Sequence, residues 1–519
     1  MKIVTADQMR EIEARAEAAG VSTDTLMENA GLAVARAARR VSGPLTGVPI
    51  LALIGPGNNG ADGLVTARHL QRWGATVTAY ICRERSIPDP KLDSAVAAGV
   101  SVISASDDPG LSRLKSTLDT SHLAIDAILG TGRARPIEGA FRDILADLQD
   151  ARSRNPRLRL LAMDLPTGLN SDTGDVDPAC VPSDITVSLG YPKRGHLTFP
   201  GADYTGVLEV ADIGIPPSLD SDVTLDLINR DWAANVLPAR PSNSHKGTYG
   251  RAMIVAGSRN FLGAAYLAAS AAGRVGAGLV TIAIPESLVP SVASKAIEPT
   301  FLPLPEAGPG IVANNAAHLI LDSLNGYSSL LLVCGLGQAA ETRQVVEELL
   351  LTDASLPPTV VDADGLNTLA RIPDWWKLWP TDAIFTPHPG EMARLTSMSA
   401  RNDRIAIARE SASAWKKTVI LKGAYTVASA PNGDAMLSPY SNPGLATAGT
   451  GDVLAGAIVG LLSQGVSIAD AASLGVYLHG EAGERARTKL GDTGMLASDL
   501  LPQLPRIIRD TRQTQTIAP

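Results

Sequence analysis

The chain has few cysteines and few aromatic residues. Its three cysteines, Cys82, Cys180 and Cys334, are far apart and show neither CxxC nor Cys/His spacing. This pattern argues against disulfide bonds, structural zinc and export. Aromatic residues make up only 4% of the chain, whereas alanine and glycine are abundant. The composition therefore favours helices packed closely on sheets over a β-sandwich.

Long apolar runs and basic tracts are also lacking. No stretch of about 20 apolar residues occurs, and the N-terminus "MKIVTADQMREIEARAEAAG" lacks the basic-then-apolar order of a signal peptide. The net charge of -8 is spread along the chain. We therefore expect a soluble cytoplasmic protein with neither a membrane nor a nucleic acid as partner.

The length of 519 residues exceeds what one hydrophobic core usually supports, so two domains are expected. Thr5 and Gln8 have the spacing of a capping box, and Gly20 suits the end of that first helix. Seven nearly continuous apolar segments follow, which predict a parallel sheet covered on both faces. They are "PILALIG" (49–55), "TVTAYIC" (76–82), "GVSVIS" (99–104), "HLAIDAIL" (122–129), "LRLLAMDLP" (158–166), "DITVSL" (184–189) and "GVLEVADIG" (206–214).

A segment rich in Pro, Ser and Asp between Pro216 and Asn243 separates this alternation from a second one. We place the boundary near Asp220, giving domains 1–220 and 221–519. The second half predicts a helix over 263–278, further strands and a helical region from Thr450. The expected strands are "RAMIVAG" (251–257), "LVTIAIP" (279–285), "SLLLVCG" (329–335), "PTVVDAD" (358–364), "AIFTPHPGE" (383–391) and "KTVILKG" (417–423). The fold class expected is α/β, with two tandem three-layer domains.

The stretch "GPGNNGADG" contains Gly55, Gly57 and Gly60 in the order G-x-G-x-x-G. Between a strand and a helix, this pattern is typical of a loop whose amides bind a phosphate. A tight turn without a ligand would produce the same pattern.

Acids follow two further strands of the first half. Asp126 precedes "ILGTG", and Asp164 precedes "LPTGLNSDTGD". Ligands of open parallel sheets gather at the carboxyl ends of strands. With Thr167 and the amide oxygen of Asn59, these carboxylates could surround a monovalent cation. Alternatively, the acids cap loops and helices.

In the second half, "AGTGD" places glycines and threonines directly before a helix with Asp452 in its first turn. Such a helix start binds anions, and the carboxylate could take a proton during phosphoryl transfer. Asp452 could equally stabilise only the helix dipole. "LKGAYT" places Lys422 after a strand, and "TPHPGEMARL" places His388 and Glu391 at a strand-to-helix turn.

The motifs "GNNGADG", "DAILGTG" and "MDLPTGLNSDTG" resemble those of the NAD(P)HX epimerase family, over residues 1 to 215. The resemblance implies a Rossmann-like fold that interconverts the R and S forms of NADH or NADPH hydrated at C6. It implies that Asn59, Asp126 and Thr167 bind potassium. Asp164 would contact the substrate and is our candidate for proton transfer, whereas Asp62 could instead accept backbone N–H groups. The implied substrate-binding residues are Asn58, Asn59, Gly60, Ala61, Asp62, Gly130, Thr131, Gly132, Arg133, Ala134, Arg135, Pro136 and Asp164.

One residue departs from the family pattern. Ala61 stands where "NNGGDG" has its second glycine. If that position requires a positive φ, alanine costs about 1 kcal/mol and impairs the epimerase.

The order "SHKGTYGRAMIVAGS", "VVDADGLN", "TPHPGEMARL", "LKGAYT" and "AGTGD" is similar to the ribokinase-like ADP/ATP-dependent NAD(P)HX dehydratases, over residues 225 to 510. The resemblance implies phosphoryl transfer to the C6 hydroxyl with Asp452 as base, then loss of phosphate. Magnesium would accompany the nucleotide, with ADP preferred over ATP. The implied nucleotide contacts are Lys422, Gly423, Ala424, Tyr425, Thr426 and Gly451. The implied substrate contacts are Ala264 (or its neighbour Ala265), Gly337, His388 and Asp452.

Together the halves resemble a bifunctional repair enzyme for NADHX and NADPHX that releases AMP and phosphate from ADP. We also expect a homo-oligomer. One rival is an alcohol kinase fused to a dinucleotide-binding regulatory domain, which the "AGTGD" motif alone would allow. Another is a non-catalytic N-terminal module, in keeping with Ala61.

Overall fold

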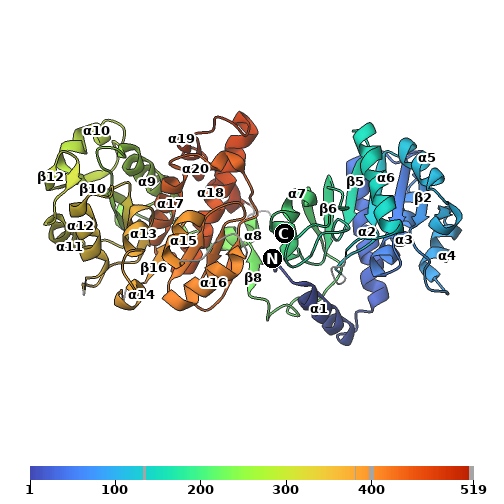
Figure 1. Cartoon of the computed structure of the whole chain (residues 1–519). Helices are drawn as coiled ribbons and strands as arrows, with labels where there is room; N and C mark the ends of the chain where they lie inside the picture. Colours follow the sequence, from blue (N-terminus) through green and yellow to red (C-terminus); the bar gives the residue numbers. More distant parts are fainter. Residues whose placement is uncertain (132–135, 353, 380–381, 397–402, 514–519) are drawn as a thin grey trace. The chain divides into compact units, whose positions relative to one another are not determined.

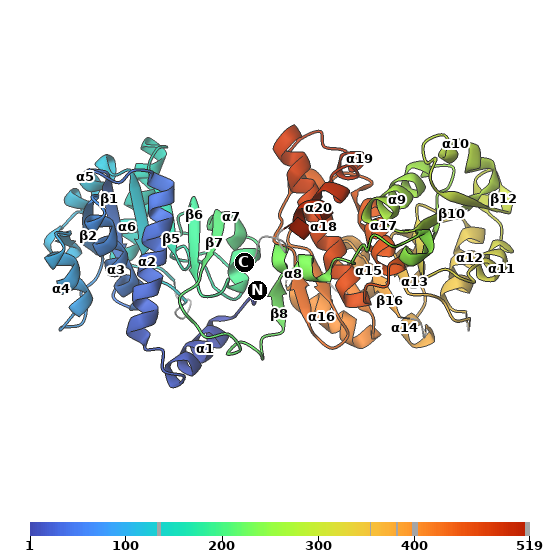
Figure 2. The same ribbon diagram turned by 180° about the vertical axis from the view of Figure 1, so that it is seen from behind.

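The computed structural model describes residues 1–131, 136–352, 354–379, 382–396 and 403–513. The chain forms two compact units, Met1–Val223 and Thr224–Pro519 (Figures 1 and 2). Among the helices within these ranges, none is long and apolar enough to cross a membrane.

The first unit is built on a seven-stranded parallel sheet, as the sequence predicts, with strand order β3-β2-β1-β4-β5-β6-β7. All seven expected segments form strands. Their bounds are β1 (Pro49–Ile54), β2 (Thr76–Ile81), β3 (Ser101–Ser104), β4 (Leu123–Ala127), β5 (Arg159–Met163), β6 (Ile185–Leu189) and β7 (Val207–Ala211).

Helices cover both faces of this sheet. Ile50 and Ile54 of β1 face one apolar cluster and Leu51 and Leu53 the other, because alternate strand residues point to opposite faces. The predicted capping box of Thr5 and Gln8 is present at the first helix. The helices on the first face are α1 (Ala6–Ala18), α2 (Thr23–Ser42), α3 (Asn58–Arg72) and α4 (Pro90–Ala97), and those on the second are α5 (Ser112–Thr120) and α6 (Ala140–Arg154). The short α7 (Gly201–Thr205) precedes β7.

The second unit has a ten-stranded sheet with order β11-β10-β9-β14-β15-β16-β17-β18-β19-β8. The strands from β11 to β17 are parallel, and β18 and β19 extend the sheet as antiparallel neighbours. The strands are β8 (Leu225–Leu227), β9 (Arg251–Ala256), β10 (Leu279–Pro285), β11 (Thr300–Leu304), β14 (Ser329–Cys334), β15 (Thr359–Val361), β16 (Ala383–Phe385), β17 (Thr418–Leu421), β18 (Val427–Ser429) and β19 (Ala435–Leu437). A separate pair consists of β12 (Glu306–Gly308) and β13 (Ile311–Val312).

Small residues allow two central helices of this unit to pack closely. Any side chain on Gly456 of α17 would collide with the Ala268 backbone of α9. The expected helical region from Thr450 begins with α17 (Thr450–Ser463), followed by α18 (Ile468–Leu490), α19 (Ala497–Leu500) and α20 (Leu504–Gln513). The other helices are α8 (Arg230–Val236), α9 (Leu262–Val275), α10 (Val289–Ala293), α11 (Ala316–Ser323), α12 (Ala340–Leu350), α13 (Asp364–Leu369), α14 (Trp375–Leu378), α15 (Pro389–Thr396) and α16 (Arg404–Trp415).

Candidate active sites

The "NNGADG" segment is the beginning of helix α3 rather than an extended loop. Gly57 is its N-cap, and the helix starts at Asn58. A side chain on Gly60 would collide with the Gly55 carbonyl oxygen. The glycine pattern therefore brings β1 and α3 into close contact and leaves backbone amides at the helix start for an anion.

The expected cost of Ala61 does not arise. Ala61 lies within α3, does not have a positive φ, and is buried, with an exposure of 7%. Its backbone is helical, so the premise that this position needs glycine for a positive φ is wrong.

Asp126 and Thr167 form a buried pair at the ends of β4 and β5. The Thr167 hydroxyl and amide each donate to the Asp126 carboxylate over 2.7 Å, and the Ile128 amide donates over 3.2 Å. Burial raises the pKa of Asp126, and these donors oppose the rise.

Asn59 approaches this pair through the β4–α6 connection. A Cβ on Gly130 would lie 3.3 Å from Asn59 Oδ1, and the neighbouring Leu129 amide donates to Thr167 Oγ1 over 3.1 Å. The buried Asn59 Nδ2 has no hydrogen-bond partner among the described residues. Amide nitrogen and oxygen are interchangeable by rotation, so an oxygen ligand can be presented here. The set of hydroxyl, amide and carboxylate oxygens fits a monovalent cation.

Asp164 is held in place by hydrogen bonds from several residues. Its φ is 64°, a conformation uncommon outside glycine. Its Oδ1 accepts from Lys193 Nζ and, over 3.0 Å, from the Leu189 amide. His196 Nε2 lies 2.8 Å from the Asp164 carbonyl oxygen. Burial, together with the charge of Lys193, lowers the pKa of His196 to about 4.

Lys193 and His196 were not anticipated from the sequence. Both are fully buried, with exposures of 0% and 1%. The sequence does place a lysine close to a predicted strand end, in "YPKRGHLTFPG". That this lysine is buried depends on tertiary packing, which the sequence does not show.

Asp62 is a second buried acid near Asp164. Its exposure is 7%, and its Oδ1 has no hydrogen-bond partner among the described residues. Burial, followed by the negative charges of Asp164 and Glu13, raises the pKa of Asp62 well above its ordinary value. No backbone N–H of the described residues therefore donates to Oδ1, and the alternative that Asp62 accepts backbone N–H groups finds no support at this oxygen.

The predicted substrate loop is described only at its edges. Gly130 and Thr131 follow β4 and are partly buried, and Pro136 is exposed. Gly132, Arg133, Ala134 and Arg135 lie outside the described residues.

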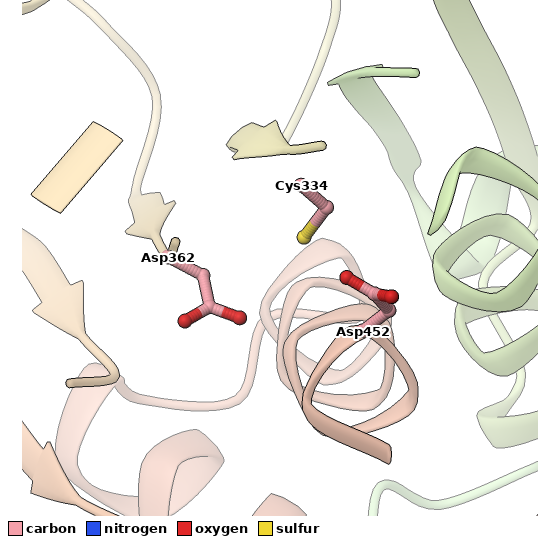
Figure 3. Close-up of side chains that lie close together, drawn as sticks. All are labelled: Cys334, Asp362 and Asp452. Atoms are coloured by element: carbon pink, nitrogen blue, oxygen red, sulfur yellow. The ribbon is translucent and has the colours of Figure 1, made fainter. Parts of the chain in front are cut away.

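In the second unit, α17 begins immediately after Gly449, whose φ is 91°. Asp452 lies in the first turn, and burial followed by the charge of Asp362 raises its pKa to about 6. The side chains of Asp452, Asp362 and Cys334 lie close together (Figure 3). One carboxylate oxygen of each acid and the Cys334 Sγ all lie within 4.8 Å of one another. Asp362 follows β15 and Cys334 ends β14, so strand ends bring the group together.

Lys422 completes this cluster from the end of β17. Its Nζ lies 2.6 Å from Asp362 Oδ1 and 3.9 Å from Glu391 Oε2. Burial opposes the charge of Lys422, but Asp362 and Glu391 leave its pKa raised. The cation is therefore held at the strand ends beside Gly451, where a Cβ would be 3.4 Å from Nζ.

This acidic cluster does not suit a directly bound magnesium ion. Magnesium prefers oxygen ligands, whereas burial raises the pKa of the Cys334 thiol and keeps it protonated. Lys422 already occupies Asp362 Oδ1. A magnesium ion would fit better on nucleotide phosphates, with any protein ligation through water.

The other residues of the predicted nucleotide-binding segment, 423–426, form a tight turn after β17. Gly423 and Tyr425 have φ values of 142° and 50°, and Thr426 Oγ1 donates to the Gly423 carbonyl oxygen over 2.7 Å. Arg404, which was not anticipated, donates to the carbonyl oxygens of Leu421, Lys422 and Ala424. It thus fixes the turn from behind.

The other predicted hydrate-binding residues follow the carboxyl ends of three strands, β9, β14 and β16. His388 is half-exposed; its Nδ1 accepts from the Gly390 amide over 2.9 Å, while its own amide donates to Glu391 Oε2 over 2.8 Å. Gly337 has φ 87°, and its amide donates to Asp364 Oδ2 over 2.9 Å. Ala264 is 8% exposed and Ala265 is fully buried, so Ala264 has the more accessible side chain.

In each unit, buried acids at the carboxyl ends of parallel strands lie near a helix start with glycine at its N-cap. This arrangement is typical of α/β enzymes, and the chain contains it twice in tandem.

Comparison with known proteins gives the family. A model of "YjeF-related protein N-terminus" matches residues 23–195, and one of "NAD(P)H-hydrate dehydratase" matches residues 252–506. The "Bifunctional NAD(P)H-hydrate repair enzyme Nnr" of Moorella thermoacetica is 38% identical over 99% of this chain and 98% of its own. Its counterpart from Thermofilum pendens is 36% identical over 99% and 97%. The chain belongs to this family of bifunctional NAD(P)H-hydrate repair enzymes.

A solved structure also matches part of the chain. The ADP/ATP-dependent NAD(P)H-hydrate dehydratase from Bacillus subtilis, co-crystallised with ATP and Mg2+, is 31% identical. The match covers 55% of this chain and 98% of that one, with a TM-score of 0.48.

Proposed function

We propose that this enzyme repairs hydrated nicotinamide cofactors in two steps. The first unit interconverts the R and S forms of NADHX and NADPHX. The second dehydrates the S form to NADH or NADPH using ADP, in preference to ATP, and releases AMP and phosphate. The proposal rests on one observation: the same chain holds two acidic groups of this kind. Asp164 is paired with Lys193 in the first unit, and Asp452 of α17 lies beside Asp362 and Cys334 in the second.

In the epimerase site, the amides at the start of α3 would bind the dinucleotide phosphates, and residues 130–136 would also contact the dinucleotide. Asn59, Asp126 and Thr167 would hold potassium, which would supply a positive charge beside the buried Asp126 carboxylate. The support is the unpartnered Asn59 amide and the absence of a cationic partner for Asp126 among the described residues. Asp164 would contact the substrate through Oδ2, because its two hydrogen bonds fall on Oδ1.

In the dehydratase site, Asp452 would accept the proton of the C6 hydroxyl as that oxygen attacks the terminal phosphorus of the nucleotide. The backbone amides of residues 449–451 would bind the transferred phosphoryl group, and Lys422 would offset charge on the nucleotide. The electron pair of the ring nitrogen would then expel phosphate, and loss of a proton from C5 would restore the dihydronicotinamide. Magnesium would accompany the nucleotide and neutralise phosphate charge.

A mixture of R and S NADHX tests this proposal. The purified protein, with potassium and magnesium, receives ADP, ATP or no nucleotide, and 340-nm absorbance is followed alongside chromatography of the epimers. Complete recovery of NADH with ADP, faster than with ATP, supports both steps and the donor preference. Recovery that stops when the S form is spent contradicts the epimerase assignment. A stable phosphorylated product from a panel of alcohols, without NADH formation, would replace the proposal with a kinase.

A further inference from the structure

The epimerase site contains two buried carboxylates in contrasting surroundings. Lys193, which is fully buried, donates to Asp164 Oδ1, to Ser188 Oγ over 3.3 Å and to the Leu189 carbonyl oxygen over 2.9 Å. All three ammonium protons thus have acceptors. These contacts hold the Asp164 side chain in one position against Lys193.

Asp62 lacks any such partner at Oδ1. That oxygen is buried near the start of α3 and has no hydrogen bond among the described residues. A buried carboxylate without donors is costly, whereas a neutral carboxylic acid is tolerated. Its charged neighbours are Asp164 after β5, Glu13 on α1 and Lys91 on α4. Two negative charges against one positive charge favour the protonated form.

Building on the proposed epimerase function, we propose that Asp62 is the proton-carrying catalytic acid of this site, and that Asp164, paired with Lys193, is its companion carboxyl group. Pairs of carboxyl groups held in unlike environments commonly divide acid and base roles in this way. The assignment explains why a polar oxygen is buried without a partner beside a site for a hydroxylated ring.

The proposed reaction balances without a further reactant. The Asp62 carboxyl group donates its proton to the C6 hydroxyl, and the C6–O bond breaks with its electron pair leaving on water. The lone pair of the ring nitrogen forms a carbon–nitrogen double bond, so the ring becomes an iminium ion and Asp62 a carboxylate. Water then adds to the opposite face of C6, and its extra proton returns to Asp62. Asp164 Oδ2 accepts a hydrogen bond from the hydroxyl or the water throughout.

The test uses Asp62→Asn in the full chain, which keeps the shape of the side chain but removes the acid. With (R,S)-NADHX, ADP and magnesium, the fast NADH phase consumes the S form and the slow phase reports epimerisation. We expect the enzyme-dependent slow phase to fall by about 10²- to 10⁴-fold, the usual contribution of a general acid. The fast phase should stay unchanged and serves as an internal control for folding of the second unit. An enzyme-free sample corrects for spontaneous epimerisation.

A second variant separates catalysis from a structural role. Glu13→Gln removes one of the negative charges that disfavour ionisation of Asp62. The wild-type epimerisation rate should fall at high pH as Asp62 loses its proton, and Glu13→Gln should move this fall to lower pH while leaving the low-pH rate unchanged. An Asp62→Asn slow phase within about threefold of wild type, or a pH limb that Glu13→Gln does not move, would overturn the assignment. A wild-type protein that never converts the R form would instead refute the underlying epimerase function.

Discussion

Lys422 and the buried Asp362 form an ion pair that bridges two strand ends on either side of β16. Lys422 follows β17, Asp362 follows β15, and 2.6 Å separates Nζ from Oδ1. Glu391, from the helix after β16, lies 3.9 Å from the same ammonium. Three consecutive parallel strands therefore place one cation between two carboxylates, next to the start of α17.

Removing one member of this pair should destabilise the second unit. Asp362→Asn leaves the mostly buried Lys422 with only the more distant Glu391, and breaking such a pair costs about 3–5 kcal/mol. The double variant Asp362→Asn/Lys422→Met should recover part of that loss, because no unpaired cation remains. Urea unfolding followed by tryptophan fluorescence measures the stability of the second unit. Five of the six tryptophans lie in that unit, and only Trp73 lies in the first. A double variant less stable than Asp362→Asn would contradict this account.

Dehydration should depend on the ionisation of Asp452. The group must be a carboxylate to act as base, and its pKa is raised to about 6. With pure (S)-NADHX and saturating ADP, kcat should be near its maximum at pH 8, half-maximal near pH 6 and fall about tenfold per unit below that. Use of the S form removes the epimerase from the measurement. A flat profile between pH 5 and 8 would argue against Asp452 as the base.

Exchanging glycine and alanine should reduce epimerase activity at position 60 but leave it nearly unchanged at position 61. Gly60→Ala forces a methyl group into the Gly55 carbonyl oxygen and should reduce consumption of the R form more than tenfold. Ala61→Gly changes a helical residue and should leave that rate within about twofold, with a stability cost of at most about 1 kcal/mol. An increase in epimerase activity for Ala61→Gly would show that alanine impairs the site after all.

The sequence predicted most of the fold because buried parallel strands appear as continuous apolar runs. All seven strands of the first sheet were found in this way. In the second unit β9, β10 and β14 to β17 were predicted, whereas β8, β11, β18 and β19, which lie toward the two ends of the sheet, and the separate pair β12 and β13 were missed. Of the site, the residues within motifs were predicted, namely Asp164, Lys422 and Asp452. Lys193 and Arg404 were missed because their roles arise from tertiary packing against distant segments.

The same argument applies to Ala61. The loop pattern suggested a turn with a positive φ, but only the structure shows that the helix already begins at Asn58. A substitution that breaks a sequence motif is therefore harmless to the backbone when the glycine was not needed for conformation.

Arg404 should control nucleotide binding without taking part in the chemistry. Its guanidinium donates to three carbonyl oxygens of the turn that carries Lys422, which a single ammonium group cannot reproduce. Arg404→Lys should raise the KM for ADP about tenfold with a smaller effect on kcat. Initial rates over a range of ADP concentrations with (S)-NADHX measure this, and the unchanged epimerisation rate is the control. A selective loss of kcat would indicate that the turn acts on the transition state instead.

The most direct test of the central claim, that two sites on one chain perform two successive steps, starts from pure (R)-NADHX. Wild-type protein with ADP, potassium and magnesium should convert all of it to NADH. Asp452→Asn should stop at a mixture of R and S forms without NADH, and Asp164→Asn should leave the R form at the enzyme-free rate. If Asp164→Asn produces NADH from the R form as fast as wild type does, the first unit is not an epimerase and the account is contradicted.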